Sequence, residues 1–143
     1  MDIQQIEQNT FGYYQAGFHC AEAILQAITE AFGAKEQANI PNMASAFCGG
    51  VGGTKQDICG ALTGGLMAIG VLCGRQTPDK DLRDVKALAS DLRAQFLAEY
   101  GSTQCQAVLN KLGQQEHAMK CKALTAHVAG VLAQLLLEKG LAL

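Results

Sequence analysis

Apolar residues recur with a helical period along most of the chain, and the clearest case lies near the N-terminus. One face of this segment carries the small or apolar residues Cys20, Ala23, Ile24, Ala27, Ile28 and Ala31. These positions follow the i, i+3, i+4, i+7 spacing that is typical of an amphipathic helix. Gly33 comes two residues after the last of these positions, where a glycine commonly ends a helix. The pattern therefore predicts a helix that begins at Cys20 and is stopped by Gly33.

Similar patterns predict six more helical segments, separated mainly by glycines. They are expected from Ile3 to just before Gly17, from Pro41 to Phe47, from about Gln56 to Cys73, from Asp79 to Tyr100, around Cys105–Leu112 behind a Ser102 or Thr103 cap, and from about His117 to Lys139. No run of alternating β-branched residues predicts a strand. We expect an all-α fold, a single-domain bundle of about six to seven helices over residues 1–143.

The segment after the loop CGGVGG is unusually rich in glycine. Gly60, Gly64 and Ala68 are four residues apart, so they share one helix face, and Thr54 or Asp57 is a candidate N-cap. Each glycine costs a helix about 1 kcal/mol relative to alanine. Small residues at this spacing allow another backbone to approach closely. We therefore expect a buried central helix with a close-packed neighbour, which is either another helix or a cofactor.

Composition narrows the class of protein. Of the 143 residues, 49% are hydrophobic and 17% are charged, and the net charge is -2. A chain without basic excess is a poor match for the nucleic-acid backbone, so no nucleic-acid partner is expected. The N-terminus MDIQQIEQNT lacks the basic and apolar regions of a secretory signal, which favours a cytoplasmic location. Residues 58–74 carry no charge, but their five glycines predict a core helix rather than a membrane span.

Four of the six cysteines fall at predicted helix starts: Cys20, Cys59, Cys105 and Cys121. Unpaired N–H groups and the helix dipole favour negative charge at this position, which lowers a thiol pKa and suits a nucleophile or a metal ligand. Cys73 is expected at a helix C-terminus, where a thiolate is disfavoured. Each cysteine also has a plain interpretation as a small core residue.

Several short motifs, spread over nearly the whole chain, together resemble one protein family. FHCAEAILQAI, then CGGVGG with DICGALTGGLMAIGV, then GSTQC and a later cysteine are similar to the C_GCAxxG_C_C family. The resemblance selects the same cysteines, Cys20, Cys59, Cys105 and Cys121. It implies a redox protein, since related domains in larger cytochromes hold an iron–sulfur cluster. Cys48, in the glycine loop, and Cys73 depart from the family pattern and are not expected to be ligands.

Four thiolates can hold a [2Fe–2S] or [4Fe–4S] cluster or close a tetrahedral zinc site. The gaps between the four cysteines are 39, 46 and 16 residues, with no C-x-x-C pair. Because structural zinc normally uses paired local ligands, zinc is the alternative to a cluster rather than the first choice. Gly60, beside Cys59, leaves room for a cofactor and exposes N–H groups that can bond to inorganic sulfide. The expected role is electron transfer or redox sensing with a redox partner protein.

Two other classes remain open. The same cysteines can act as thiol–disulfide pairs without metal, for example Cys59 with Cys20 or Cys105 with Cys121. Alternatively, the chain is a structural helical module that forms a homodimer through its glycine-rich helix. No Ser/His/Asp or paired-carboxylate arrangement supports hydrolase chemistry, so no catalytic residue beyond the thiols is assigned. His127, among apolar neighbours, is expected in the core or at an interface.

Overall fold

The computed structural model describes residues 1–33 and 40–143, which form seven α-helices and one short 3₁₀ helix, with no strand in these ranges. The elements are α1 (Ile3–Gln15), α2 (Cys20–Ala31), α3 (Ile40–Met43), η1 (Ser45–Phe47), α4 (Gly60–Cys73), α5 (Arg83–Tyr100), α6 (Cys105–Leu112) and α7 (Met119–Glu138). The predicted all-α fold class is confirmed, and α2 begins at Cys20 as predicted and ends at Ala31, shortly before the predicted stop at Gly33. That residues 1–143 are one domain stays a prediction.

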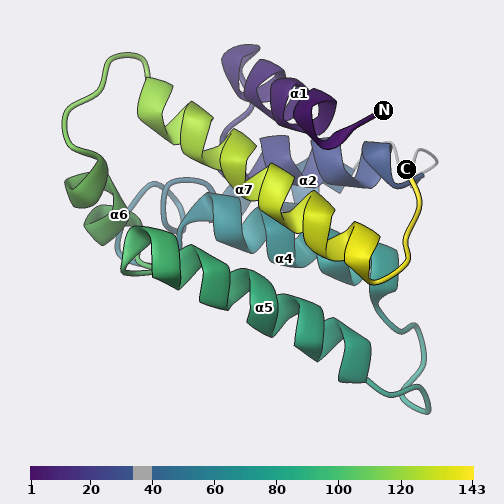
Figure 1. Ribbon diagram of the computed structural model, residues 1–143. Helices are drawn as coiled ribbons and strands as arrows, with labels where there is room; N and C mark the ends of the chain where they lie inside the picture. The colour runs from purple at the N-terminus through teal and green to yellow at the C-terminus, as the bar shows by residue number, and fades with distance from the viewer. Residues whose placement is uncertain (34–39) are drawn as a thin grey trace.

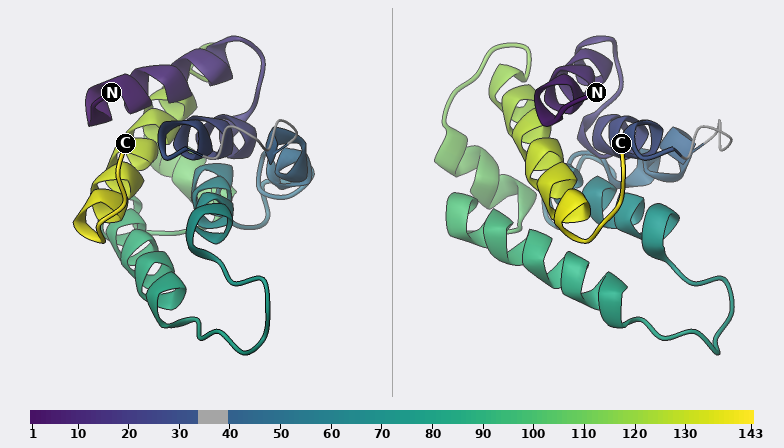
Figure 2. Two further views of the ribbon diagram at one scale, coloured as in Figure 1. Left: turned by 90° about the vertical axis from the view of Figure 1, so that its right-hand side faces the viewer. Right: turned by 45° about the vertical axis from the view of Figure 1, so that its right-hand side comes forward.

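Helices α1, α2, α4 and α5 pack against α7, which crosses the middle of the bundle (Figure 1). Helix α1 lies along α7, α2 makes its most extensive contact with α4, and α5 packs on both α4 and α7. Helices α2, α4 and α7 all begin at the end of the bundle where α6 lies, on the left of Figure 1. The two turned views keep the same grouping (Figure 2). The N-termini of α2, α4 and α7 are therefore gathered at one end of the molecule.

The core lies where α2, α4 and α7 meet. Ile24, Leu62 and Leu132 each have no exposed surface. Helix α4 approaches α2 closely at Gly64, where a Cβ atom would lie 2.8 Å from the Ala21 Cα and would collide with the Ala21 carbonyl oxygen. The prediction that the glycine-rich helix is central and closely packed is confirmed, and its neighbour at this point is another helix.

Helices α5 and α7 begin later than their patterns predict, as does α4, whose start is described with the site below. Helix α5 starts at Arg83 rather than Asp79, and its N-cap, Leu82, makes no side-chain capping bond. Helix α7 starts at Met119 rather than His117, because His117 and Ala118 have φ values of 52° and 55°, which lie outside the right-handed helical region. In both cases a periodic pattern continued into residues whose backbone is not helical.

One described helix, α7, is long and apolar enough to cross a membrane. However, 61% of its most apolar window is buried inside the fold, which is typical of a core helix and gives weak evidence for a span. Helix α4, the uncharged segment noted in the sequence, has only 14 residues, fewer than the roughly 20 that a bilayer requires.

Candidate functional site

The four cysteines of the predicted site lie at helix starts, as the sequence indicated. Cys20 is the first residue of α2, Cys59 is the N-cap of α4, Cys105 is the first residue of α6, and Cys121 is the third residue of α7. Since these helices begin at one end of the bundle, residues up to 101 positions apart in the chain reach the same region.

A short extended pairing sets Cys59 beside the start of α6. The Cys59 N–H donates to the Thr103 carbonyl at 2.7 Å, and the Cys105 N–H donates to the Asp57 carbonyl at 2.8 Å. Ile58 and Gln104 form the isolated β-bridge between these bonds. Because Asp57 and Cys59 make these backbone bonds to residues 103–105 instead of helical ones, α4 begins at Gly60 rather than at Gln56. The predicted N-caps, Thr54 and Asp57, are therefore wrong, as are the Ser102 and Thr103 caps predicted for α6, whose N-cap is Gln104.

Glycines allow the thiol-bearing residues to approach neighbouring backbone. A Cβ atom at Gly60 would collide with the Cys20 sulfur and would lie 3.2 Å from the Ala21 nitrogen. A Cβ atom at Gly50 would lie 2.6 Å from the Cys105 Cβ. The Cys20 sulfur therefore rests directly on the first residue of α4, and Cys105 rests on the glycine loop. The space beside Gly60 that the sequence left for a cofactor is used, at least in part, by the Cys20 side chain.

The glycine loop itself has an unusual backbone. Five successive residues, Gly49 to Gly53, have φ between 62° and 74°, and one of them, Val51, is β-branched, which makes this conformation a genuine outlier. The loop is fixed by backbone bonds from the Gly53 N–H to the Cys48 carbonyl and from the Lys55 N–H to the Gly49 carbonyl. It thus holds Cys48 and Gly50 in position against Cys20 and Cys105.

Cys20 is the one cysteine whose pKa is lowered, to about 6. The largest cause is a hydrogen bond from the Cys48 thiol, which stabilises the thiolate and outweighs burial, which acts in the opposite direction. The Gly49 and Ala21 N–H groups and the nearby His19 lower the pKa further. This agrees with the prediction that helix N-termini favour thiolates, and it adds a specific donor.

The same prediction is wrong for the other three cysteines of the site. Burial, followed by the charge of Cys20, raises the pKa of Cys59 to about 12. Burial is also the largest cause of the raised pKa of Cys105 and of Cys121, followed by the Cys20 charge for Cys105. At Cys121 a bond from the Gln115 amide, with Nε2 at 3.1 Å from the sulfur, acts in the opposite direction. Desolvation of a buried thiolate outweighs the favourable helix terminus at these positions.

Cys48 is another cysteine of this region with a raised pKa, although the sequence analysis did not include it among the site residues. Its side chain is 8% exposed, and its pKa is raised, first by its hydrogen bond to Cys20 and then by burial. The available signal was the unusual cysteine at the start of CGGVGG, directly before a loop that glycines allow to fold back. Cys73, by contrast, lies at the end of α4, where burial and then Asp84 raise its pKa.

Tyr14 adjoins the cysteines from α1. Its pKa is raised by burial and then by the charges of Cys20, Cys121, Cys48 and Cys59. The His19 ring stacks on the Tyr14 ring with centroids 6.3 Å apart. The end of α1 therefore forms one wall of the cysteine region.

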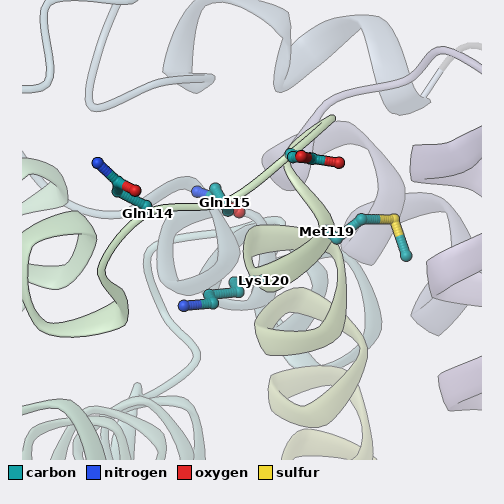
Figure 3. A pocket seen from close by; sticks show the side chains of 5 residues that line it. Gln114, Gln115, Met119 and Lys120 are labelled. Atoms are coloured by element: carbon teal, nitrogen blue, oxygen red, sulfur yellow. The ribbon is translucent and has the colours of Figure 1, made fainter.

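An open pocket of about 680 Å³ lies next to Cys121. Its lining comes from the α6–α7 connection and the first residues of α7: Gln114, Gln115, Glu116, Met119 and Lys120 (Figure 3). Gln115 links the pocket to the cysteine, because its Oε1 accepts the Cys121 N–H at 2.9 Å. Polar, flexible side chains thus surround the approach to this end of the site.

Cysteine sulfurs are the type of ligand that a metal–sulfur cofactor requires, but these residues are not arranged to bind a single metal ion. Among residues 1–33 and 40–143, no three His, Cys, Asp or Glu side chains gather closely enough to hold a single metal ion. Four cysteines nevertheless share one region, and nearby backbone N–H groups lower the pKa of two of them: those of Gly49 and Ala21 act on Cys20, and those of Ala61 and Leu62 act on Cys59. Thiol sulfurs that accept N–H bonds are suited to hold a cluster and to tune it.

His127 is not a core residue, so this part of its prediction is wrong. It is exposed on α7, and its Nε2 lies 2.8 Å from Glu99 Oε2 on α5. That it lies at an interface stays a prediction.

Comparison with known proteins agrees with this arrangement of cysteines. The family described as "Putative redox-active protein (C_GCAxxG_C_C)" matches residues 18–135, which include Cys20, Cys59, Cys105 and Cys121. No curated protein and no solved structure shows significant similarity to the chain. The chain belongs to the C_GCAxxG_C_C family.

Proposed function

We propose that this protein is a cytoplasmic redox protein in which Cys20, Cys59, Cys105 and Cys121 hold an iron–sulfur cluster for electron transfer or redox sensing. The observation that carries the proposal is the delivery of these four cysteines, from four separate helix starts, to one end of the bundle. Such an arrangement needs the whole fold, which is why the sequence contains no local C-x-x-C pair.

The chain's own residues would prepare the region for a cluster. The Ala61 and Leu62 N–H groups at the start of α4 lower the pKa of Cys59, and the Gln115 amide donates a hydrogen bond to the Cys121 sulfur. These donors offset the negative charge that cysteinate ligands bring to a buried place. When bound, an iron–sulfur cluster supplies reversible one-electron transfer.

A cluster fits the arrangement better than zinc. One zinc ion requires its ligand sulfurs at about 2.3 Å from a common centre, and the described residues contain no group of three ligands so arranged. A cluster spreads its ligands over several irons, so the cysteines surround a larger volume. The glycines at positions 50 and 60, which adjoin Cys105 and Cys20, favour such a close approach.

Thiol–disulfide exchange without metal is the second candidate. The observation in its favour is the lowered pKa of Cys20, about 6, because a thiolate is the attacking species in exchange. In that case the Cys20 thiolate carries out the exchange, either alone or together with a second thiol of the same region.

Matched serine variants test the proposal. The chain is purified without oxygen, and iron, acid-labile sulfide and zinc are assayed together with the visible spectrum. We expect Cys59→Ser to lose iron and sulfide, while Cys73→Ser, a cysteine of the same helix outside the site, retains both. Equal iron and sulfide in the two variants would refute the ligand assignment, and a colourless, metal-free wild type with an oxidisable thiol pair would favour the second candidate.

A further inference from the structure

The side chain of Gln115 makes two hydrogen bonds to one residue, Cys121. Its Oε1 accepts the Cys121 N–H at 2.9 Å, and its Nε2 donates to the Cys121 sulfur at 3.1 Å. A backbone N–H can only donate, so the carbonyl end of the amide must face it, and this leaves the NH₂ end for the sulfur. One carboxamide therefore holds both the backbone and the side chain of this cysteine.

The bond to the Cys121 N–H replaces a missing helix cap. The first N–H groups of a helix have no partner within it, and the N-cap side chain commonly accepts from the third residue. The N-cap of α7 is Ala118, which makes no side-chain capping bond, and Cys121 is the third residue of the helix. Gln115, three positions before the N-cap, performs this role from outside the helix.

The backbone of the α6–α7 connection brings Gln115 to this place. His117 and Ala118 have φ values of 52° and 55°, and two successive left-handed residues, which are uncommon for any residue but glycine, turn the chain sharply just before α7. The Lys120 Nζ donates to the Leu112 carbonyl at 2.8 Å and so ties the start of α7 to the end of α6. Both ends of the connection are thereby fixed while Gln115 contacts Cys121.

Gln115 also lies between Cys121 and solvent. It is half-buried and lines the open pocket of about 680 Å³, whereas its neighbour Gln114 lines the same pocket but is exposed (Figure 3). Cys121 is itself only partly buried. A side chain unable to hydrogen-bond at position 115 would leave the Cys121 N–H and sulfur to water from the pocket, which does not fix their direction.

We propose that Gln115 is a positioning residue for Cys121, in which one carboxamide caps α7, orients the sulfur and tunes the group that the sulfur ligates. The last part rests on the proposed function. The reduced form of an iron–sulfur cluster carries one more electron than the oxidised form, so an N–H donor to a ligand sulfur stabilises the reduced form more and raises the reduction potential. The two hydrogen bonds to Cys121 carry the inference.

Hydrogen exchange followed by NMR tests the two bonds in the metal-free chain. Wild type is compared with Gln115→Leu, which keeps neither bond, with Gln115→Glu, whose carboxylate accepts but does not donate, and with the control Gln114→Leu. We expect the Cys121 N–H to exchange on the order of fivefold faster in Gln115→Leu, and at the wild-type rate in the other two variants. In wild type, the carboxamide protons of Gln115 should exchange more slowly than those of Gln114.

The reduction potential of protein loaded with iron and sulfide, measured by titration with dithionite, tests the tuning. We expect a lower potential for Gln115→Leu than for wild type, because the donor is lost. Gln115→Glu should have the lowest potential, because a negative charge then faces the sulfur, and Gln114→Leu should match wild type. Since the glutamate variant keeps the cap, its potential reports on the donor without loss of the helix start.

The outcomes separate this inference from the proposed function. A Cys121 N–H that exchanges equally fast in wild type and Gln115→Leu, or Gln115 carboxamide protons that exchange like those of Gln114, overturns the positioning role. Equal potentials in all four loaded proteins overturn the tuning. Failure of wild type to bind iron overturns the proposed function and the tuning together, while exchange in the metal-free chain still decides whether Gln115 holds Cys121.

Discussion

Replacing Gly64 with alanine tests the close contact between α4 and α2 that places Cys59 next to Cys20. The added methyl group would lie 2.8 Å from the Ala21 Cα and would also collide with the Ala21 carbonyl oxygen. Because these are backbone atoms, they cannot rotate away, and the two helices must separate. Overpacking of a core costs about 1–3 kcal/mol, whereas alanine returns up to about 1 kcal/mol of helix propensity.

Since backbone receives the methyl group, we expect the upper part of the overpacking range and a net loss of about 2 kcal/mol, a factor of about 30 in the folded-to-unfolded ratio. Urea unfolding followed by far-UV circular dichroism measures the loss as a lower midpoint with an unchanged slope. Gly70→Ala, in the same helix, is the control: a Cβ there meets nothing within 4 Å, so it should gain up to about 1 kcal/mol. A Gly64→Ala midpoint at or above that of wild type would refute the packing argument.

Two further predictions concern the thiols. Gly60→Ala places a methyl group against the Cys20 sulfur. We therefore expect this variant to contain much less iron and sulfide than the control Gly70→Ala. Equal iron and sulfide in the two variants would contradict this prediction. In metal-free chain at neutral pH, iodoacetamide should modify Cys20 first, because the Cys48 hydrogen bond lowers its pKa to about 6, while burial raises the pKa of Cys59 to about 12. Peptide mass mapping over a time course checks this, and earlier labelling of any other cysteine would show that the pKa argument is wrong.

The spacing of apolar residues was sufficient to predict a helix wherever that apolar face is buried in the core. The boundaries of α2 follow directly from its apolar face and from the glycine after it. The start of α4 could not be predicted, because residues 55–59 satisfy their backbone groups by pairing with a segment about 46 positions further along the chain. Such long-range pairing leaves no mark in a local helical pattern.

The candidate site was predictable in its residues but not in its electrostatics. Helix starts identified Cys20, Cys59, Cys105 and Cys121, and the family match includes them all. The thiol pKa values depend on burial, which raises three of the four, and on a neighbour that the helical pattern does not place. That neighbour is Cys48, brought to Cys20 by a left-handed glycine loop.

The most direct test of the central claim is the iron and acid-labile sulfide content per chain of wild-type protein purified without oxygen and without added metal. The account predicts iron and sulfide in equal amounts, with a visible absorption band that disappears on reduction. Protein that is folded, colourless and free of both iron and sulfide would contradict the assignment of these four cysteines as the ligands of a cluster.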